Sequence, residues 1–177
     1  MKLYLDIETT GLSATSNELT VVGALRGSEF VQLVQGKNLD RELVESLFAG
    51  SNEVVSFNGI RFDVPFLRSA YPTICVPSVH KDLMYAGWNV GLKGGLKSLE
   101  VQLGISRSSG VKNGYEAVLL WKKYLKGCTE SLDRLLAYNR EDVLNLPVLE
   151  KKLEARRRRL DRMGKKDSAD LNKSLNG

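Results

Sequence analysis

The sequence predicts an α/β fold, in which strands and helices pack as layers around a shared core. Three segments that read as strands open the chain: residues 2–12 hold the first strand and its turn, and Leu19–Leu25 and Glu29–Val34 hold the next two. A helical period follows in Leu39–Gly50, and a strand returns at Val54–Val55. The length agrees with this fold class, because 177 residues are enough to bury the core of one domain.

Short turns connect the first three strands, so an antiparallel meander is expected there. Residues 26–28, Arg-Gly-Ser, separate the second strand from the third. In the helical segment that follows, Leu39, Leu43 and Leu47 share one face, and Gly50 is a stop signal. The order strand, strand, strand, helix, strand is typical of a layered α/β architecture.

The second half of the chain is mostly helical by its pattern of apolar residues. A Gly-rich loop and a polar loop interrupt it, and no internal repeat is present. The expected elements are, in order, a helix at Arg61–Tyr71, a short strand that ends near Asp82, helices at about 96–103 and 115–125, and a long helix from about Thr129 that keeps an apolar stripe to Leu153.

The basic charge is concentrated at the C-terminal end. The formal net charge is +5, yet residues 1–150 hold 16 Lys and Arg against 17 Asp and Glu, and residues 151–177 hold 10 against 4. We therefore divide the chain into a domain at 1–150 and a basic helical extension at 151–177, whose end beyond Met163 is expected to fray or be disordered. Such an extension can contact a polyanion, or it can be a solvated helix end whose cations suit the helix C-terminus.

Composition and cysteine usage indicate a globular protein of the cytoplasm. Hydrophobic residues make up 42% and charged residues 27%, as in ordinary soluble domains. No apolar run reaches the length of a membrane span, and no charged leader precedes an apolar segment, so neither spanning nor secretion is expected. Cys75 and Cys128 are isolated and match no metal-ligand spacing. We interpret them as ordinary thiols in a reducing cytoplasm.

Two acidic residues end the first apolar segment. Residues two apart in a strand point to the same face, so Asp6 and Glu8 project together while Leu5 and Ile7 face the other way. Paired carboxylates repel each other, and burial beside a sheet raises the cost of charging them. A hard divalent cation removes this cost because it prefers oxygen ligands. The pair alone fits either a metal site or a strand edge with two solvated acids.

Two later segments carry further acids. Asp63 follows the turn Asn58-Gly59 near an expected helix start, where the helix dipole alone would favour an acid. Tyr138 and Asp142 lie four apart on the last strong helix and share its inward, apolar face, whereas Glu141 lies off this face and is expected in solvent. An inward Asp needs a partner or a metal, but an inward Tyr can be plain core.

Together, these three stretches resemble the DEDD superfamily of 3′→5′ exonucleases. Asp6 and Glu8 match its D-x-E strand, Asp63 matches its N-G-x-x-F-D segment, and Asp142 matches its terminal Y-x-x-x-D. Each motif is short, but all four acids occur in the superfamily's order within residues 1–150. The resemblance implies a ribonuclease H-like α/β fold, with a central mixed sheet flanked by helices.

The residues before the last Asp separate two subtypes of that superfamily. The histidine subtype has its His five positions before the last Asp, and Ala137 occupies that position here. Tyr138 stands four positions before Asp142, so the chain resembles the tyrosine subtype. The sole histidine, His80, lies elsewhere and is interpreted as structural or, at most, as a substrate contact. The segments LKGGLKSLEVQLGI and YEAVLLWKKYLKG, followed by LLAYNREDV, resemble most the small YprB-type predicted exonucleases.

The resemblance implies a hydrolase that cuts phosphodiester bonds at the 3′ end of single-stranded DNA or RNA, with two Mg²⁺ or Mn²⁺ ions as cofactors. It implies that Asp6 bridges both ions, that Glu8 and Asp142 help to bind the ion that activates water, and that Asp63 holds the second ion, partly through water. Tyr138 would orient the attacking water, since a group with a pKa near 10 is a poor base at neutral pH. Further positions match those that commonly meet substrate: the backbone of Ile7, Thr9 and Thr10, the side chain of Leu12, and, as second-line candidates, Asn58 and Phe62.

Two alternatives stay open: a non-catalytic nucleic-acid-binding module of the same fold, and an endonuclease or junction resolvase of the same fold class. The four acids argue against the first, and the Tyr-x-x-x-Asp spacing favours the exonuclease over the second. Lys93, Lys97 and Trp88 around the Gly-rich loop form a weaker candidate surface for nucleic acid. Asp82 is interpreted as a helix cap or a hydrogen-bonding neighbour of the site. No motif reports the contacts near the 2′-hydroxyl that separate RNA from DNA.

Overall fold

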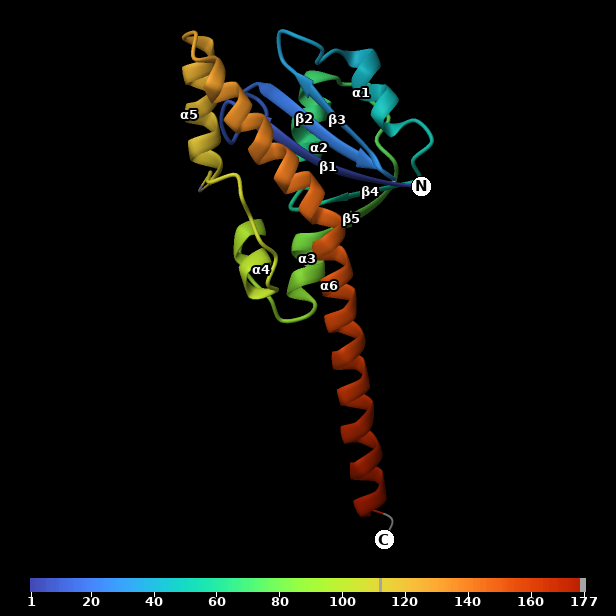
Figure 1. Cartoon of the computed structure of the whole chain (residues 1–177). Coiled ribbons are helices and arrows are strands. Elements are labelled where there is room, and N and C mark those ends of the chain that lie inside the picture. Colours follow the sequence, from blue (N-terminus) through green and yellow to red (C-terminus); the bar gives the residue numbers. More distant parts are fainter. Residues whose placement is uncertain (112, 176–177) are drawn as a thin grey trace.

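The computed structural model describes residues 1–111 and 113–175, and their side chains as far as Gly164. Within these residues the chain forms one mixed sheet with helices on both faces (Figure 1). The strands are β1 (Lys2–Thr9), β2 (Leu19–Arg26), β3 (Glu29–Val34), β4 (Glu53–Ser56) and β5 (Val79–Asp82). The helices are α1 (Arg41–Phe48), α2 (Asp63–Ala70), α3 (Leu83–Trp88), α4 (Leu96–Gln102), α5 (Gly114–Leu125) and α6 (Thr129–Leu175).

The sheet combines antiparallel and parallel pairing. Its strand order is β3-β2-β1-β4-β5, so β1 lies at the centre. β1, β2 and β3 form the antiparallel meander that their short turns predict. β4 runs parallel to β1 on its other side, and β5 runs parallel to β4. The predicted α/β fold with a central mixed sheet is therefore confirmed.

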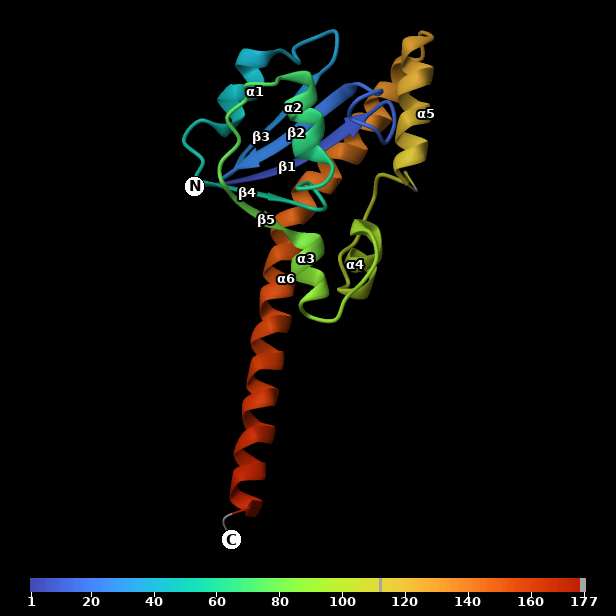
Figure 2. The ribbon, with the colours of Figure 1, turned by 180° about the vertical axis from the view of Figure 1, so that it is seen from behind.

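Alternate residues of β1 face two different cores. On one face, Leu5 and Ile7 pack with Val44 of α1 and Phe66 of α2, the two helices that lie before the sheet in Figure 2. The opposite face is covered by α6, with α5 beside it at one end and α3 and α4 at the other, and Leu146 is fully buried there. The polar residues that alternate with Leu5 and Ile7 therefore face α6.

The last helix is continuous across the sheet and beyond it. Its C-terminal part projects away from the rest of the molecule (Figure 1), and Arg156–Arg159 on this part are exposed. The structure continues α6 to Leu175, where fraying or disorder was expected, and residues 176–177 of the predicted extension lie outside the described residues. The division at residue 150 falls inside this helix and stays a prediction. Within the described part of the chain, no helix is both long and apolar enough to cross a membrane.

The short helix α3 was not predicted from the sequence. It follows β5 directly because Asp82 caps it, with Oδ1 accepting a hydrogen bond from the Met84 backbone N–H at 3.0 Å. A helix of six residues is too short to show an apolar period, so the sequence pattern does not predict it. The interpretation of Asp82 as a helix cap agrees with this geometry.

Candidate active site

Three of the four predicted acids meet where β1 packs against α6. One carboxylate oxygen from each of Asp6, Glu8 and Asp142 lies within 4.8 Å of the others. Asp6 and Glu8 reach this point because they alternate along β1 with side chains of the opposite core. Asp142 extends toward them from α6, and Glu8 and Asp142 are buried. We call this group the carboxylate cluster.

A glycine in β2 allows α6 to approach the sheet so closely. Gly23 pairs with Asp6 in the antiparallel ladder, and a Cβ atom at Gly23 would lie 2.2 Å from Asn139 Oδ1 and 2.9 Å from Val143 Cγ2. Asn139 Nδ2 donates to Asp6 Oδ2 at 2.9 Å, while Asn139 Oδ1 accepts from Gln32 Nε2 at 2.8 Å. Asn139 therefore orients Asp6. Sequence reasoning missed it, although a glycine inside an apolar strand is a signal of close backbone approach.

The fourth acid, Asp63, lies beside the cluster at the start of α2. It is buried, and its negative charge contributes to raising the pKa of both Asp6 and Glu8. The turn before it needs a glycine, because a Cβ atom at Gly59 would lie 2.1 Å from Ser56 Oγ and 3.2 Å from Asp63 Oδ2. The structure thus places Asp63 near the other three acids, though it is not part of the group within 4.8 Å.

Burial makes the cluster electrostatically unfavourable without a cation. Burial first, and neighbouring carboxylates second, raise the pKa of Asp6 and Glu8 well above the usual range. Burial raises the pKa of Asp63 to about 8 and the pKa of Asp142 to about 6, the latter against the opposing charge of a nearby arginine. Converging carboxylate oxygens that resist ionisation are the donor set that a hard divalent cation stabilises, so these residues fit a metal site.

Burial and the charge of Asp142 also raise the pKa of Tyr138, so its hydroxyl stays protonated at neutral pH. The ring is buried, with Lys97 Nζ 4.3 Å and Arg107 Cζ 5.4 Å from its centroid. The same two cations act to lower the pKa of Glu8, against burial and its acidic neighbours. The phenol therefore stands between the cluster and two positive charges.

The guanidinium of Arg107 was not predicted to be part of the site. Arg107 comes from the loop between α4 and α5 and forms ion pairs with Asp142, with Glu100 at 2.8 Å and with Glu141 at 3.2 Å. Glu100 is fully buried and also accepts from Asn145 Nδ2 at 2.9 Å. The prediction that Glu141 lies in solvent is wrong, because its side chain is only 13% exposed under this loop. Arg107 meets these acids through tertiary contacts, which no local sequence pattern predicts.

Four residues that were predicted to meet substrate lie at the end of β1 and just after it: Ile7 and Thr9 belong to β1, and Thr10 and Leu12 to the loop that follows. Ile7 is buried in the core, so only its backbone is available. Thr9 Oγ1 donates to the Gly11 carbonyl at 2.6 Å, and the Thr10 side chain also bonds back into the loop. Leu12 is 88% exposed at the end of this turn. All four are close neighbours of Asp6 and Glu8 in the chain, and their contact with substrate stays a prediction.

The second-line substrate residues lie in the turn before α2. Asn58 has a φ of 61°, and its backbone N–H donates to Asp82 Oδ1 at 2.8 Å, so Asp82 fixes this turn as well as α3. Phe62 is partly buried against the core at the start of α2. His80 Nε2 lies 2.7 Å from Ser56 Oγ, which is consistent with a structural histidine.

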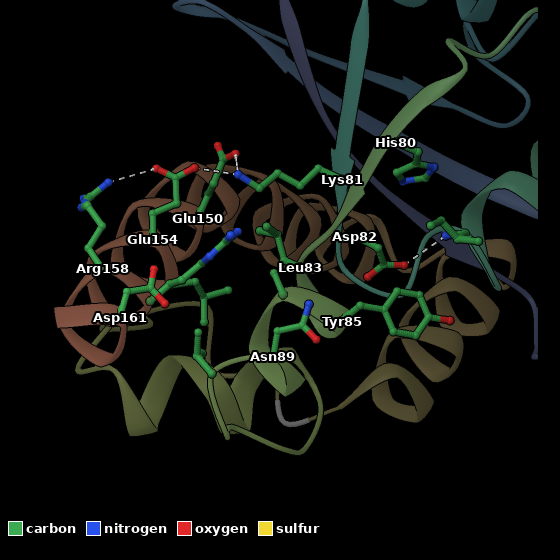
Figure 3. Close-up of a pocket in the computed structure, with 15 residues that line it drawn as sticks. His80, Lys81, Asp82, Leu83, Tyr85, Asn89, Glu150, Glu154, Arg158 and Asp161 are labelled. Carbon is green, nitrogen blue, oxygen red and sulfur yellow. Dashed lines mark hydrogen bonds and ion pairs between the residues drawn. The ribbon is translucent and has the colours of Figure 1, made fainter. Parts of the chain in front are cut away.

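A separate pocket of about 630 Å³ lies between β5, α3 and α6 (Figure 3). Lys81 reaches into it and pairs with Glu150 and Glu154, each at 2.6 Å, and Glu154 also lies 3.9 Å from Arg158. None of the four predicted acids is among the residues that line it. Glu150 and Glu154 already face protein cations, so the pocket differs in chemistry from the carboxylate cluster.

Solved structures of other proteins share this fold. NrnC of Brucella melitensis, solved with bound pGG, is 24% identical with a TM-score of 0.64, over 96% of this chain and 78% of that one. RNase D of Escherichia coli, described as an exoribonuclease involved in structured RNA processing, is 16% identical with a TM-score of 0.62, over 88% and 39%. The family B DNA polymerase of the hyperthermophilic archaeon Pyrobaculum calidifontis is 16% identical with a TM-score of 0.65, over 86% and 24%. At these identities the likeness concerns the fold alone.

Sequence comparison gives the family. A search among curated proteins returns no match. The model of the family RNase_H_2, described as RNase_H superfamily, matches residues 3–154, a span that includes the four acids and Tyr138. The ribonuclease H-like fold implied by the resemblance is therefore confirmed. On this match over most of its length, the chain belongs to the RNase_H superfamily.

Proposed function

We propose that this protein is a metal-dependent 3′→5′ exonuclease of the tyrosine DEDD subtype, akin to the YprB-type enzymes. It would shorten single-stranded nucleic acid by hydrolysing the phosphodiester bond at the 3′ end. The observation that carries the proposal is the convergence of Asp6, Glu8 and Asp142 within 4.8 Å, with Asp63 and Tyr138 beside them. These are the residue types, in the order and on the elements, that the resemblance predicts.

The cofactors would be two Mg²⁺ or Mn²⁺ ions. Bound together, two such ions would supply a nucleophilic water at neutral pH and stabilise the leaving oxygen. Asp6, Glu8 and Asp142 would hold one ion, and Asp6 with Asp63 the other. Support comes from the raised pKa of all four carboxyls, because burial, with repulsion from neighbouring carboxylates, raises them and a bound cation offsets the cost of ionising them. The structural neighbour NrnC has also been solved with bound Mg²⁺.

The remaining groups of the site have roles that follow from their protonation and charge. Tyr138 stays protonated, so its hydroxyl can orient the attacking water by hydrogen bonding but is a poor base. Lys97 and Arg107 place positive charge beside Tyr138, on the path of an incoming phosphate. The terminal nucleotide would contact the backbone of Ile7, Thr9 and Thr10 and the exposed side chain of Leu12.

We assign the reaction to residues 1–150 and regard the basic extension at 151–177 as a second, sequence-independent contact for the polyanion. The exposed arginines on the projecting part of α6 support this contact. We place the protein in the cytoplasm, since both cysteines, Cys75 and Cys128, are free thiols.

The direct test is digestion of 5′-labelled single strands, DNA and RNA in parallel, with Mg²⁺, with Mn²⁺ or with a chelator. We expect a ladder of shortening products with either metal and an intact strand with the chelator. Asp6→Asn should abolish the ladder, while Asp133→Asn, an exposed acid on the same helix as Asp142, should leave it unchanged.

Three results would contradict the proposal. Near-normal digestion by Asp6→Asn would remove the assigned site. Cleavage of a circular single strand would replace the exonuclease with an endonuclease, because a circle has no end. Tight binding without turnover in either metal would instead indicate a binding module of the same fold.

A further inference from the structure

An open groove of about 760 Å³ adjoins the candidate active site, where α3 faces the Gly-rich loop before α4. Figures 1 and 2 both show α3 and α4 side by side below the sheet. Its volume is in the range of about 300–1,000 Å³ that is typical of ligand sites. The residues that line it are Phe57, Asn58, Met84, Trp88, Lys93, Gly94, Gly95 and Leu96.

Both walls of the groove lead to residues of the candidate active site that lie beside the carboxylate cluster. On one wall, Asn58 belongs to the turn that leads to Asp63. On the other wall, Leu96 is followed directly by Lys97, whose Nζ lies 4.3 Å from the ring centroid of Tyr138. A strand whose end lies among the acids therefore has this groove as its neighbouring surface.

The lining combines an exposed aromatic ring with a positive charge. Trp88 is 45% exposed, and Tyr85 packs edge-on against it with ring centroids 5.1 Å apart, which holds the indole in place. Lys93 is exposed, and among the residues described no carboxylate lies within 4.0 Å of its ammonium. The pocket of Figure 3 differs, because Lys81 and Arg158 there already face carboxylates.

An aromatic platform beside a basic side chain is what a single strand of nucleic acid binds. Each base has a flat π-face, so stacking is tolerant of sequence, and lysine meets the phosphates. Gly94 and Gly95 add no side chain that would keep a flat base out of the groove. A protein segment would not require the unpaired ammonium beside the indole.

We propose that this groove is a nucleobase subsite for the strand just upstream of the cleaved bond, with Trp88 stacked on a base and Lys93 at its phosphate. The inference rests on the proposed function and adds to it where the protein binds the substrate strand upstream of the cleaved bond. It implies that a substrate with several nucleotides binds better than one with a single nucleoside, with little preference for sequence.

The first experiment measures binding by tryptophan fluorescence, without turnover, in a chelator. The chain has two tryptophans, and Trp121 is only 2% exposed, so it serves as an internal reference. Single-stranded hexanucleotides, deoxy and ribo in separate titrations, should quench the wild-type emission. The Trp88→Phe variant, which emits from Trp121 alone, should show no quenching.

The second experiment compares a hexanucleotide with thymidine 5′-(p-nitrophenyl phosphate), which carries the same type of bond but no upstream base. Trp88→Ala should raise KM for the hexanucleotide about tenfold, as expected for one lost stacking contact, and leave the ester unchanged. Trp88→Phe should restore most of the loss. Lys93→Gln should reduce the slope of log affinity against log salt by about 0.7, the value for one phosphate contact on a single strand.

The matched control is Val101→Ala, which truncates an exposed apolar side chain of α4 outside the groove. This variant should leave KM for both substrates unchanged. The proposal is overturned if the hexanucleotides fail to quench Trp88, or if Trp88→Ala impairs both substrates equally. If the wild-type protein cuts neither substrate, the proposed function fails, and the fluorescence titration still decides whether the groove binds nucleic acid.

Discussion

Buried acids occur at two places between β1 and α6, a single glutamate at one and the carboxylate cluster at the other, and their surroundings differ. At the start of β1, Glu150 accepts hydrogen bonds from Lys2, Tyr4 and Lys81, each at 2.6 Å. Burial acts to raise the pKa of Glu150, but these three donors outweigh it and lower that pKa. The pair of lysines and the phenol therefore satisfy this carboxylate within the protein. Its role is to join β1 and β5 to the helix.

About two helical turns earlier on α6, which is about 12 Å along the axis, the same two elements hold the carboxylate cluster. There, burial and the neighbouring carboxylates raise the pKa of Asp6 and Glu8, and Arg107 compensates only Asp142 directly. The comparison separates two kinds of buried acid. A buried acid that the protein surrounds with hydrogen-bond donors is structural. A cluster of buried acids whose negative charge the protein does not neutralise is arranged for a bound cation.

The largest expected effect is on activity. Asp6→Asn should slow the shortening of a single strand at least about a hundredfold, because a lost cation ligand removes several kcal/mol of transition-state stabilisation. Glu150→Gln should stay within about threefold of wild type, since its carboxylate lies about two helical turns from the cluster. Initial rates with saturating Mg²⁺ measure both. Equal losses in the two variants would remove the distinction between the two groups.

The next effect is on stability, at Arg107, which links Asp142 of the cluster to the buried Glu100. Arg107→Gln should lower the free energy of unfolding by about 3 kcal/mol, because it leaves the fully buried Glu100 without its cation. Urea denaturation in a chelator measures the loss. The double variant Arg107→Gln with Glu100→Gln should recover part of it, and a strictly additive double variant would show that the two side chains do not interact.

Smaller changes in stability, of opposite sign, are expected when Glu150 and Asp6 are each replaced by the corresponding amide. Glu150→Gln should destabilise by about 1–2 kcal/mol, less than a fully buried pair, because solvent screens Lys2 and Lys81, which are 39% and 30% exposed. Asp6→Asn should raise stability in a chelator at pH 8, since it removes a repelled charge while Asn139 can still donate to the new amide oxygen. Denaturation midpoints of the two variants give the signs directly.

The parts of this site that follow a local period could be predicted from the sequence. Asp6 and Glu8 share a face because strand residues alternate, and Tyr138 and Asp142 share one because they lie four apart on a helix. The apolar stripe of α6 also showed which way that helix faces. These periods, together with the order of the elements, were enough to predict the α/β class and the antiparallel meander, whereas the mixed sheet was predicted from the family resemblance.

The parts that depend on tertiary contacts could not be predicted. Arg107 reaches the cluster from a polar loop whose sequence has no period, and Asn139 acts on Asp6 only because Gly23 admits the helix. The exposed position of Trp88 likewise follows from α3, which is too short to leave an apolar pattern. Local patterns place a side chain on a face, whereas its partners are known only when distant segments meet.

The last and smallest effect concerns how thermal stability depends on pH. The acids of the site and Glu150 contribute to this dependence with opposite signs. In the unfolded chain, carboxyls titrate near pH 4. The folded protein without metal keeps protons on Asp142 to about pH 6 and on Asp63 to about pH 8, so stability should fall as pH rises from about 4 through these values. The lowered pKa of Glu150 acts in the opposite direction, and its contribution is lost only below about pH 4.

Melting curves at pH 5 and pH 8, each with and without Mg²⁺, test this difference. Mg²⁺ should raise the melting temperature by a few degrees more at pH 8, because the ion binds carboxylates that have lost their protons and competes with protons at pH 5. Asp63→Asn should reduce the fall in melting temperature between pH 5 and pH 8. Glu150→Gln should leave that fall in place and change the melting temperature only at acidic pH. An equal Mg²⁺ shift at both pH values would mean that the cluster is already ionised without a cation, and the distinction between a compensated and an undercompensated acid would then fail.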